Sequence, residues 1–374
     1  MIIAVNTRNL PDDFPEGYGY FIFEIFKRIA ANNPRHQFIF IFNGKYDQRF
    51  VFGANVTPVI AGPAARHPLL WKFWYDVKVP AVLKKYKADV FVSCDGICSL
   101  ATNVPQCLVI HDLAFLHYPS FVKKSHLLFY KKYTPEFLSK AKSIAVVSGF
   151  LKQEIIDQYK TTEAEIDVVF NAANETFQPV SDNEKIATKN KYTGGLEYFI
   201  YAGLIDPQKN LLNLLKAFSV FKKRQQTNMK LVLTGKTVKK YGSFAEDLKS
   251  YKYRKDVVLT GTVEETELVQ LIGAAYGLVY PSLYEGFAAP VLEAMKCEVP
   301  VITSANSSMQ EIAKGAALYA DGTSYRDIAD KMMLLYKDEN LRKRLIQKSR
   351  QVADNYSWDK TADLLWQSIL KACK

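Results

Sequence analysis

Short apolar runs alternate with amphipathic segments along the chain, and this alternation constrains the fold more than any other feature. Apolar runs stand at Ile2–Asn6, Gln106–Ile110 and Tyr198–Gly203, among other places, and Asn210–Arg224 repeats its large apolar residues at helical spacing. Strands that alternate with helices form parallel sheets covered by helices on both faces. The sequence therefore predicts an α/β protein with two doubly wound, Rossmann-like sheets.

The length favours two domains of ordinary size, because 374 residues are many for one hydrophobic core. The segment Asn171–Asn183 lacks periodicity and contains Pro179 and Ser181, so we place the linker there. The predicted first domain spans residues 1–172 and the predicted second domain spans residues 173–355.

Composition excludes several classes of protein. No apolar run approaches the ~20 residues of a membrane-spanning helix, and Met1–Asp13 has no basic region of a signal peptide, so we expect a cytoplasmic protein. The five cysteines form no C-x-x-C pair, which favours buried free thiols over a zinc site. The net charge of +11 fits an anionic substrate, an anionic lipid surface or an unspecialised cationic surface. No nucleic-acid recognition motif is present, so we expect no nucleic-acid partner.

The stretch Tyr280–Ser308 predicts a strand, a tight loop, a helix and a second strand. Its loop and helix start would present backbone N–H groups and the positive end of a helix dipole, which suits phosphate. Glu285 and Glu293 should lie about 10 Å apart, too far for the nucleophile and acid of a retaining glycosidase. They can bracket a long polar ligand, with Glu293 on a ribose diol. The alternative is a helix start in which glutamate is favoured by the dipole.

The motif E-G-F-x-x-P-x-L-E-A-M followed by C-x-V-P-V-I resembles the E-x7-E region of the retaining glycosyltransferases of family 4, also called group 1. This resemblance implies the GT-B fold, in which two Rossmann-like domains face a central cleft. It also implies that the second domain binds a nucleotide-diphosphate sugar. The donor-binding positions carried over in this stretch are Glu293, Gly286, Phe287 and Ala288, and Glu285 would position the sugar.

Four further segments are similar to the family. Gly203–Asn210 resembles G-x-x-x-P-x-K-N and implies that Gly203 and Lys209 bind the diphosphate. H-D-L-x-F-L-x-Y-P implies that His111 faces the transferred sugar, and Val263 lies where the family contacts the base. Residues 356–374 resemble the final helix, which returns to the first domain.

The segment Thr7–Tyr20 is predicted to be a loop that precedes a helix. Its glycines Gly17 and Gly19 resemble the first loop of the family, which faces the cleft, and the alternative is a flexible turn before a helix. A dinucleotide fingerprint is excluded because Ile22 stands at the third glycine position.

The resemblance implies a metal-independent hexosyltransferase that needs no cofactor beyond its nucleotide-sugar co-substrate. It would act in cell-surface polysaccharide or glycolipid synthesis, with a saccharide or lipid-linked saccharide as acceptor. The stretch His67–Lys87 mixes aromatic residues with lysines. It forms either an amphipathic helix packed on its own sheet or an interfacial surface for peripheral contact with the inner face of the membrane.

Three departures from the family pattern keep a second interpretation open. Leu204 and Gln208 occupy positions at which many members carry an arginine, and Ala288 replaces a common glycine, so that its methyl group is expected to crowd a phosphate. A catalytically degenerate sugar-nucleotide-binding protein of the same fold is therefore the alternative. An epimerase or phosphorylase of GT-B fold is a further one.

Overall fold

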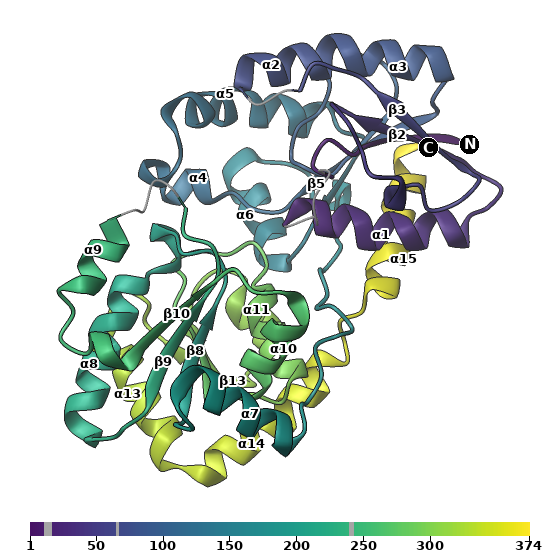
Figure 1. Ribbon diagram of the computed structural model, residues 1–374. Helices are drawn as coiled ribbons and strands as arrows, with labels where there is room; N and C mark the ends of the chain where they lie inside the picture. The colour runs from purple at the N-terminus through teal and green to yellow at the C-terminus, as the bar shows by residue number, and fades with distance from the viewer. Residues whose placement is uncertain (11–16, 65–66, 239–242) are drawn as a thin grey trace. The chain divides into compact units, whose positions relative to one another are not determined.

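The computed structural model describes residues 1–10, 17–64, 67–238 and 243–374, and Figure 1 shows its ribbon. The chain divides into two compact units. The first comprises Met1–Asn171 together with Ser357–Lys374, and the second comprises Ala172–Tyr356. The boundaries placed from the sequence lie one residue from these divisions.

The first unit is built on a seven-stranded parallel sheet in the order β3-β2-β1-β4-β5-β6-β7. The strands are β1 (Ile2–Asn6), β2 (Gln37–Phe42), β3 (Val56–Ile60), β4 (Val90–Ser93), β5 (Gln106–Ile110), β6 (Ser143–Val146) and β7 (Ile166–Val168). The strand order runs outward in one direction from β1 and in the other from β4. The topological switch point, where open α/β sheets bind ligands, therefore lies between β1 and β4.

Helices cover this first sheet. They are α1 (Tyr18–Asn32), α2 (Pro68–Phe73), α3 (Val79–Tyr86), α4 (Ala114–His117), α5 (Lys124–Lys140), α6 (Gly149–Tyr159) and α15 (Trp358–Ala372). A π turn at Trp74–Lys78 joins α2 to α3, so His67–Lys87 is helical over most of its length, as predicted.

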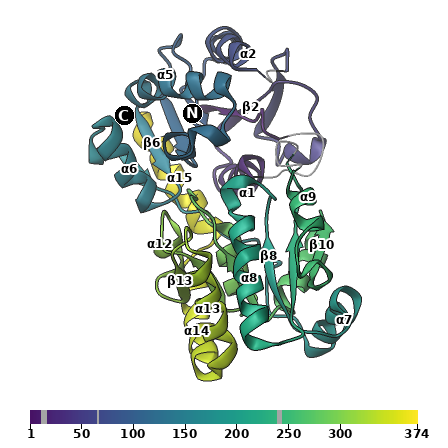
Figure 2. The ribbon, with the colours of Figure 1, turned by 90° about the vertical axis from the view of Figure 1, so that its left-hand side faces the viewer.

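The C-terminal helix α15 packs beside β6 and α1, as Figure 2 shows. Ser357 begins it, because its hydroxyl oxygen accepts a hydrogen bond from the backbone N–H of Lys360. Leu365 and Ile369 are completely buried, and the Thr361 hydroxyl donates to the carbonyl oxygen of Phe170 at 2.6 Å. These contacts make the C-terminal residues part of the first unit.

The second unit holds a six-stranded parallel sheet in the order β10-β9-β8-β11-β12-β13. The strands are β8 (Tyr198–Ala202), β9 (Lys230–Thr234), β10 (Val257–Gly261), β11 (Gly277–Tyr280), β12 (Val301–Ser304) and β13 (Ala317–Ala320). The helices are α7 (Asp182–Thr193), α8 (Leu211–Gln225), α9 (Ser243–Lys249), α10 (Glu265–Gly273), α11 (Ala289–Lys296), α12 (Met309–Ala313), α13 (Tyr325–Lys337) and α14 (Glu339–Ala353). In Figure 1, α8 and α13 lie together on one side of this sheet and α10 and α11 on the other. The switch point falls between β8 and β11.

The prediction of two doubly wound parallel sheets is confirmed, with one local correction. Helix α1 begins at Tyr18, so the loop predicted to extend to Tyr20 ends earlier and Gly19 is a buried residue of the first helical turn. Gly17 is the residue before the helix and has a φ of 56°, a left-handed conformation that glycine adopts without strain. Part of that predicted loop, residues 11–16, lies outside the described residues.

Candidate functional site

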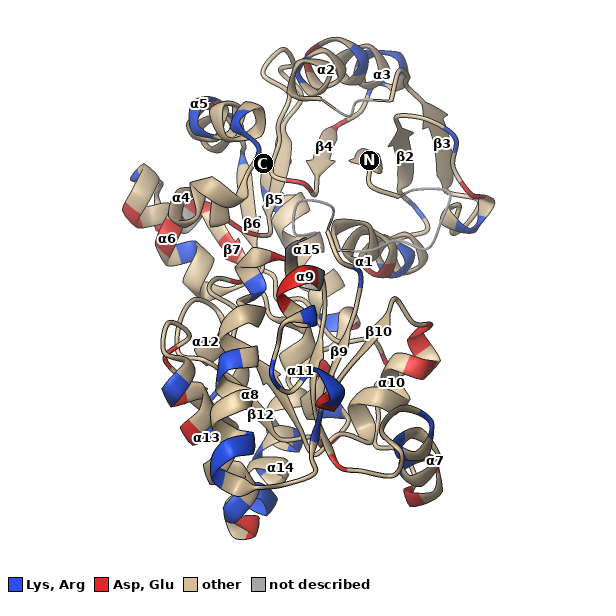
Figure 3. Ribbon diagram, turned by 60° about the vertical axis from the view of Figure 1, so that its left-hand side comes forward, with Lys and Arg blue, Asp and Glu red and all other residues tan. Residues whose placement is uncertain are grey.

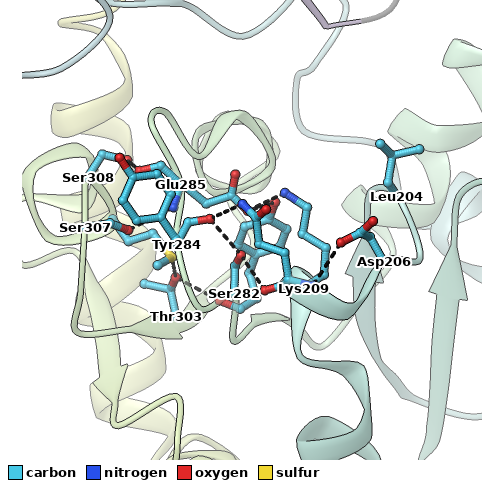
Figure 4. Close-up of polar contacts among 12 residues, drawn as sticks. Leu204, Asp206, Lys209, Ser282, Tyr284, Glu285, Thr303, Ser307 and Ser308 are labelled. Carbon is cyan, nitrogen blue, oxygen red and sulfur yellow. Dashed lines mark hydrogen bonds and ion pairs between the residues drawn. The ribbon is translucent and has the colours of Figure 1, made fainter. Parts of the chain in front are cut away.

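The loops after β8 and β11 meet at the switch point of the second unit, and an ion pair joins them (Figure 4). The Lys209 Nζ lies 2.5 Å from Oε1 of Glu285, and both side chains are largely buried. The Tyr280 hydroxyl donates to the same carboxylate oxygen at 2.8 Å. Burial and the neighbouring Glu285 charge raise the pKa of Tyr280 well above its usual value, so its phenol stays protonated. Two residues predicted for the site are therefore in direct contact.

Gln208 forms hydrogen bonds that hold these two loops together. Its side-chain amide donates to the backbone carbonyl oxygen of Tyr284 at 2.8 Å, and its backbone carbonyl oxygen accepts from the N–H of Leu283 at 2.9 Å. Asp206 caps the short turn that carries Lys209 by accepting from the N–H of Gln208. Gln208 stands where many family members have an arginine, and here it ties the lysine loop to the Glu285 loop.

The loop after β12 fixes the backbone of Glu285 from a third strand end. The N–H of Glu285 donates to the Ser307 hydroxyl oxygen at 3.0 Å, and the Ser308 hydroxyl donates to the Glu285 carbonyl oxygen at 2.9 Å. These serines are not among the residues predicted for the site. Their place directly after a predicted strand was the signal that could have found them, because carboxyl ends of parallel strands meet at one edge.

The segment that leads into α11 has backbone N–H groups available to an anion. The N–H groups of Gly286 and Phe287 have no hydrogen-bond acceptor among the residues that the structure describes. They stand at the start of α11, where the helix dipole favours negative charge. Ala288 is completely buried with a φ of −89°, so glycine is not required there. Its methyl group packs inside the protein, where it does not crowd a ligand.

Glu293, in the middle of α11, is a half-buried carboxyl group to which no donor in the described part of the chain forms a hydrogen bond. Burial, with the Glu265 carboxylate as a second cause, raises the pKa of Glu293 to about 7. Glu265 itself accepts hydrogen bonds from Asn174 and Thr176, each at 2.8 Å. Glu293 is thus an unpaired acceptor suited to a ligand that brings its own hydroxyl donors.

Glycines let the strand ends at this edge approach one another. Gly203 follows β8 with a φ of 139°, and a Cβ atom on Gly235, after β9, would lie 1.9 Å from the Gly203 carbonyl oxygen. The N–H of Gly235 donates in turn to the carbonyl oxygen of Gly261 at the end of β10. Val263 lies two residues further on and is half-buried. Gly203, Val263 and the loop that carries Glu285 therefore all follow strands at one edge of the sheet, and Glu293 lies in the helix that begins there.

His111 belongs to the first unit and directly follows β5. Its Nε2 lies 3.1 Å from the carbonyl oxygen of Cys94, which requires the N–H tautomer at Nε2 and leaves Nδ1 as an acceptor. The ring stacks on Tyr18 and meets Phe21 edge-on, each at 4.6 Å between centroids. Burial lowers the pKa of His111 to about 4, so the imidazole is neutral at physiological pH.

A second buried pair, Arg8 and Asp95, joins the ends of β1 and β4 in the first unit at 2.6 Å. This pair was not predicted from the sequence, although each residue stands two positions after a strand. Among the described residues, no group of three or more His, Cys, Asp or Glu side chains is arranged to hold a metal ion. In the same part of the chain, no helix is long and apolar enough to cross a membrane.

Two Rossmann-like units, the second with a lysine, free N–H groups and an unpaired glutamate at its switch point, define a glycosyltransferase of GT-B fold. The family model described as "Glycosyl transferases group 1" matches residues 182–352, and that described as "Glycosyltransferase Family 4" matches residues 16–177. The chain belongs to the group 1 glycosyltransferases, of the family 4 type.

Curated relatives include the O-antigen chain mannosyltransferase B of Escherichia coli, which is 29% identical over 67% of this chain and 66% of its own length. The O-antigen chain mannosyltransferase RfbU of Salmonella typhimurium is 26% identical over 71% of this chain and 70% of its own length. Among solved structures, Anabaena Alr3699/HepE in complex with UDP and glucose has a TM-score of 0.77 at 14% identity, covering 99% of both chains. That likeness confirms the fold.

Proposed function

We propose that this protein transfers a hexosyl group from a nucleotide-diphosphate sugar to an acceptor hydroxyl, with retention of anomeric configuration. The observation that carries the proposal is the edge of the second sheet. There Lys209, the free N–H groups before α11 and the unpaired Glu293 present complementary partners for a diphosphate and a ribose. The role in cell-surface polysaccharide or glycolipid synthesis rests on the O-antigen mannosyltransferases to which the chain is similar.

Each residue has a defined part in this proposal. Lys209 and the N–H groups of Gly286 and Phe287 stabilise the charge that grows on the leaving diphosphate, and this requires neither a metal ion nor a further cofactor. Glu293 accepts hydrogen bonds from the ribose hydroxyls. When Lys209 turns to the diphosphate, Glu285 keeps the Tyr280 hydrogen bond and is released to bind the sugar. For His111 the family resemblance implies contact with the transferred sugar, and its neutral Nδ1 is an acceptor for a sugar hydroxyl.

The identity of the donor is proposed from the relatives. Both of the relatives described above are named as mannosyltransferases, so mannose is the sugar that we propose first. The neighbouring Anabaena structure holds UDP, so uridine and guanosine donors both belong in the test.

We further propose that the protein acts in the cytoplasm and contacts an anionic membrane surface through α2, α3 and α5. Residues 67–87 and 119–142 contain eleven lysines and only two acidic residues, so their net charge of +9 is most of the chain's +11. Figure 3 shows the basic residues on α3 and α5. Exposed apolar side chains lie among them, namely Leu69 (77% exposed), Phe73 (41%), Val77 (50%) and Leu128 (70%). Lysines beside exposed apolar groups are typical of surfaces that bind anionic lipid.

The second candidate is a sugar-nucleotide-binding protein that does not catalyse transfer. Leu204, where many family members carry an arginine, is 44% exposed and supplies no charge. Gln208, at the other arginine position, is engaged in tying two loops together. Lys209 is then the cation that the loop after β8 offers to a diphosphate.

A thermal-shift panel tests the proposal. GDP, UDP and their mannose and glucose conjugates are each added to the wild-type protein and to Glu293→Ala. A ligand that binds only the folded state raises the melting temperature by mass action. We expect one nucleotide class to raise it in the wild type and to have much less effect in Glu293→Ala. A shift without any hydrolysis or transfer of the donor sugar would favour the binding protein. No shift with any nucleotide would contradict both candidates.

A further inference from the structure

The Arg8 guanidinium lies at the topological switch point of the first sheet, where no binding role has been assigned. Arg8 follows β1 and Asp95 follows β4, the two strands at which the strand order reverses. The Arg8 Nε donates to Asp95 Oδ2 at 2.6 Å, so the pair bridges the two loops. Ligands of open α/β sheets bind in the crevice at this point.

The surroundings of Arg8 hold it in one position. Asp95 also accepts from the Tyr75 hydroxyl at 2.6 Å and from the Asn9 amide at 3.3 Å. The guanidinium carbon lies 5.2 Å from the ring centre of Trp71 and 5.5 Å from that of Tyr75. Cation–π contacts and a charge-assisted hydrogen bond thus orient the guanidinium before any ligand arrives.

Most of the donors of this guanidinium lack a partner. Only Nε forms a hydrogen bond within the described residues, although the Arg8 side chain is just 9% exposed. Both Nη groups, with four N–H donors, have no acceptor in that part of the chain. The Nη nitrogens are absent from the completely buried, unpartnered side-chain atoms of the described residues, so they open to solvent, where a ligand oxygen can accept from them.

Tyr130 adds a donor near Arg8, close enough for each group to affect the pKa of the other. Its ring centre is 6.1 Å from that of Trp71, and no acceptor among the described residues binds its hydroxyl. Burial raises the pKa of Tyr130 to about 12, which keeps the hydroxyl protonated and able to donate.

The first unit repeats an arrangement seen in the second. At the other switch point a cation, a carboxylate and a tyrosine hydroxyl also meet, as Lys209, Glu285 and Tyr280. In the first unit the corresponding groups are Arg8, Asp95 and Tyr75. The difference is the cation. Lysine presents a point charge, whereas the planar guanidinium presents parallel N–H donors that match two oxygens of a phosphate or carboxylate.

We propose that the Arg8 Nη groups and the Tyr130 hydroxyl bind an oxyanion, a phosphate or a carboxylate, carried by the acceptor. The assignment to the acceptor rests on the proposed function. The anion site itself does not, because it is built within the first unit. An acceptor with a phosphate-linked lipid and one with an acidic sugar both satisfy this chemistry.

Equilibrium dialysis with radiolabelled inorganic phosphate, and with glucuronate as the carboxylate probe, tests the site. The background is the full chain carrying Lys209→Met and Glu285→Gln, which removes the cation of the second unit without leaving an unpaired carboxylate. Into it are introduced Arg8→Lys, Tyr130→Phe and, as a control, Arg49→Lys. Arg49 also pairs with an aspartate, Asp47, and contacts an aromatic ring, Phe50, but it is more exposed.

We expect one of the two anions to bind the background protein, with roughly tenfold weaker binding in Arg8→Lys, because the paired N–H donors are lost. A smaller loss in Tyr130→Phe and none in Arg49→Lys are expected. Which probe binds distinguishes a phosphate-bearing acceptor from an acidic saccharide. Binding that is equal in all three variants, or no binding of either anion at millimolar concentration, overturns the proposal. The readout involves neither nucleotide nor turnover, so it is independent of whether the second unit binds a sugar nucleotide.

Discussion

The Glu293 carboxyl group destabilises the ligand-free protein when it ionises. Its pKa is about 7 in the folded protein against a usual value of 4.5, so the folded state retains a proton that the unfolded state releases between these two values. The free energy of unfolding therefore falls as the pH rises from 4.5 to 7. We expect Glu293→Gln to be more stable than the wild type by about 1–3 kcal/mol at pH 7.5, and by much less at pH 4.5.

Urea unfolding at both pH values measures this difference in stability. The exposed Glu246→Gln is the control, and a stability difference for Glu293→Gln that is independent of pH would contradict the prediction.

Nucleotide binding should lower the pKa of Glu293 from its raised value in the ligand-free protein. Hydroxyl donors from a ribose favour the ionised carboxylate, so its pKa falls on binding and a proton is released near pH 6.5. Calorimetric titration in buffers that differ in ionisation enthalpy counts the released protons. We expect a release of up to one proton in the wild type and none from this group in Glu293→Gln. Equal release by the two proteins would mean that Glu293 does not bind the ligand.

The ion pair between Lys209 and Glu285 predicts a non-additive pair of substitutions. Removing one partner of a largely buried pair leaves an uncompensated charge, whereas replacing both does not. We expect Lys209→Met to lose about 1–3 kcal/mol of unfolding free energy at pH 7. The double variant with Glu285→Gln should recover much of that loss, while both variants lose transfer activity. A double-mutant cycle by urea unfolding measures the coupling, and strictly additive losses would exclude it.

At the same scale, the sequence indicated candidate site residues but not the contacts that they form with one another. Lys209 and Glu285 were chosen because each matches a motif and follows a strand. Their contact depends on β8 and β11 being neighbours, and the order of strands in a sheet is not encoded in the local pattern of either loop. Gln208 was noted only as a missing arginine, because its role depends on the Tyr284 carbonyl oxygen, 76 residues away in the chain.

At the scale of elements, the packing of strand ends depends on glycine. A Cβ atom at Gly235 would lie 1.9 Å from the Gly203 carbonyl oxygen, and Gly235 has a φ of 133°. We expect Gly235→Ala to destabilise the protein by roughly 3 kcal/mol or more and to displace the loop that carries Lys209. Gly261→Ala is the matched control. Its φ is 69° and nothing lies within 4 Å of its Cβ position, so it should cost only about 1 kcal/mol. Urea unfolding compares the two, and equal losses would show that the close approach is unimportant.

Elements with strong periodicity were predictable, and those with conflicting local signals were not. Neither β3 nor β13 was predicted as a strand from the sequence. Strand β3 contains Pro58, which a central strand excludes but an edge strand tolerates, and β3 is the edge of its sheet. Strand β13 is a four-residue edge strand, ALYA, with little β-branched character. The start of α1 was placed too late because Gly17 and Gly19 indicate a loop, whereas only Gly17 has a left-handed φ.

For the whole molecule, basic charge and exposed apolar side chains are concentrated in the same place. The fold brings α2 and α5 together, with Trp71 packed against Phe129. It thereby joins two basic segments that are separate in the chain. On α5, Lys124, Leu128 and Lys131 recur at helical spacing on one face, and all three are exposed. An anionic bilayer would neutralise the lysines and bury the leucine.

Vesicle sedimentation tests this surface with a matched pair of charge reversals. We expect the protein to bind vesicles with an anionic lipid at low salt and to dissociate as salt increases, because screening weakens attraction at the surface. Each lysine near such a surface contributes about 1 kcal/mol, so Lys124→Glu with Lys131→Glu should weaken partitioning more than tenfold. The control is Lys343→Glu with Lys348→Glu on α14, an equal change of charge on a helix that exposes no large apolar side chain.

If both pairs of substitutions weaken vesicle binding equally, the attraction depends on net charge alone. If the wild type does not bind at low salt, the membrane contact is excluded. A loss confined to the α5 pair, deepened by Leu128→Ser, assigns the contact to this surface, because the lysines of the α14 pair have no large exposed apolar side chain on their helix.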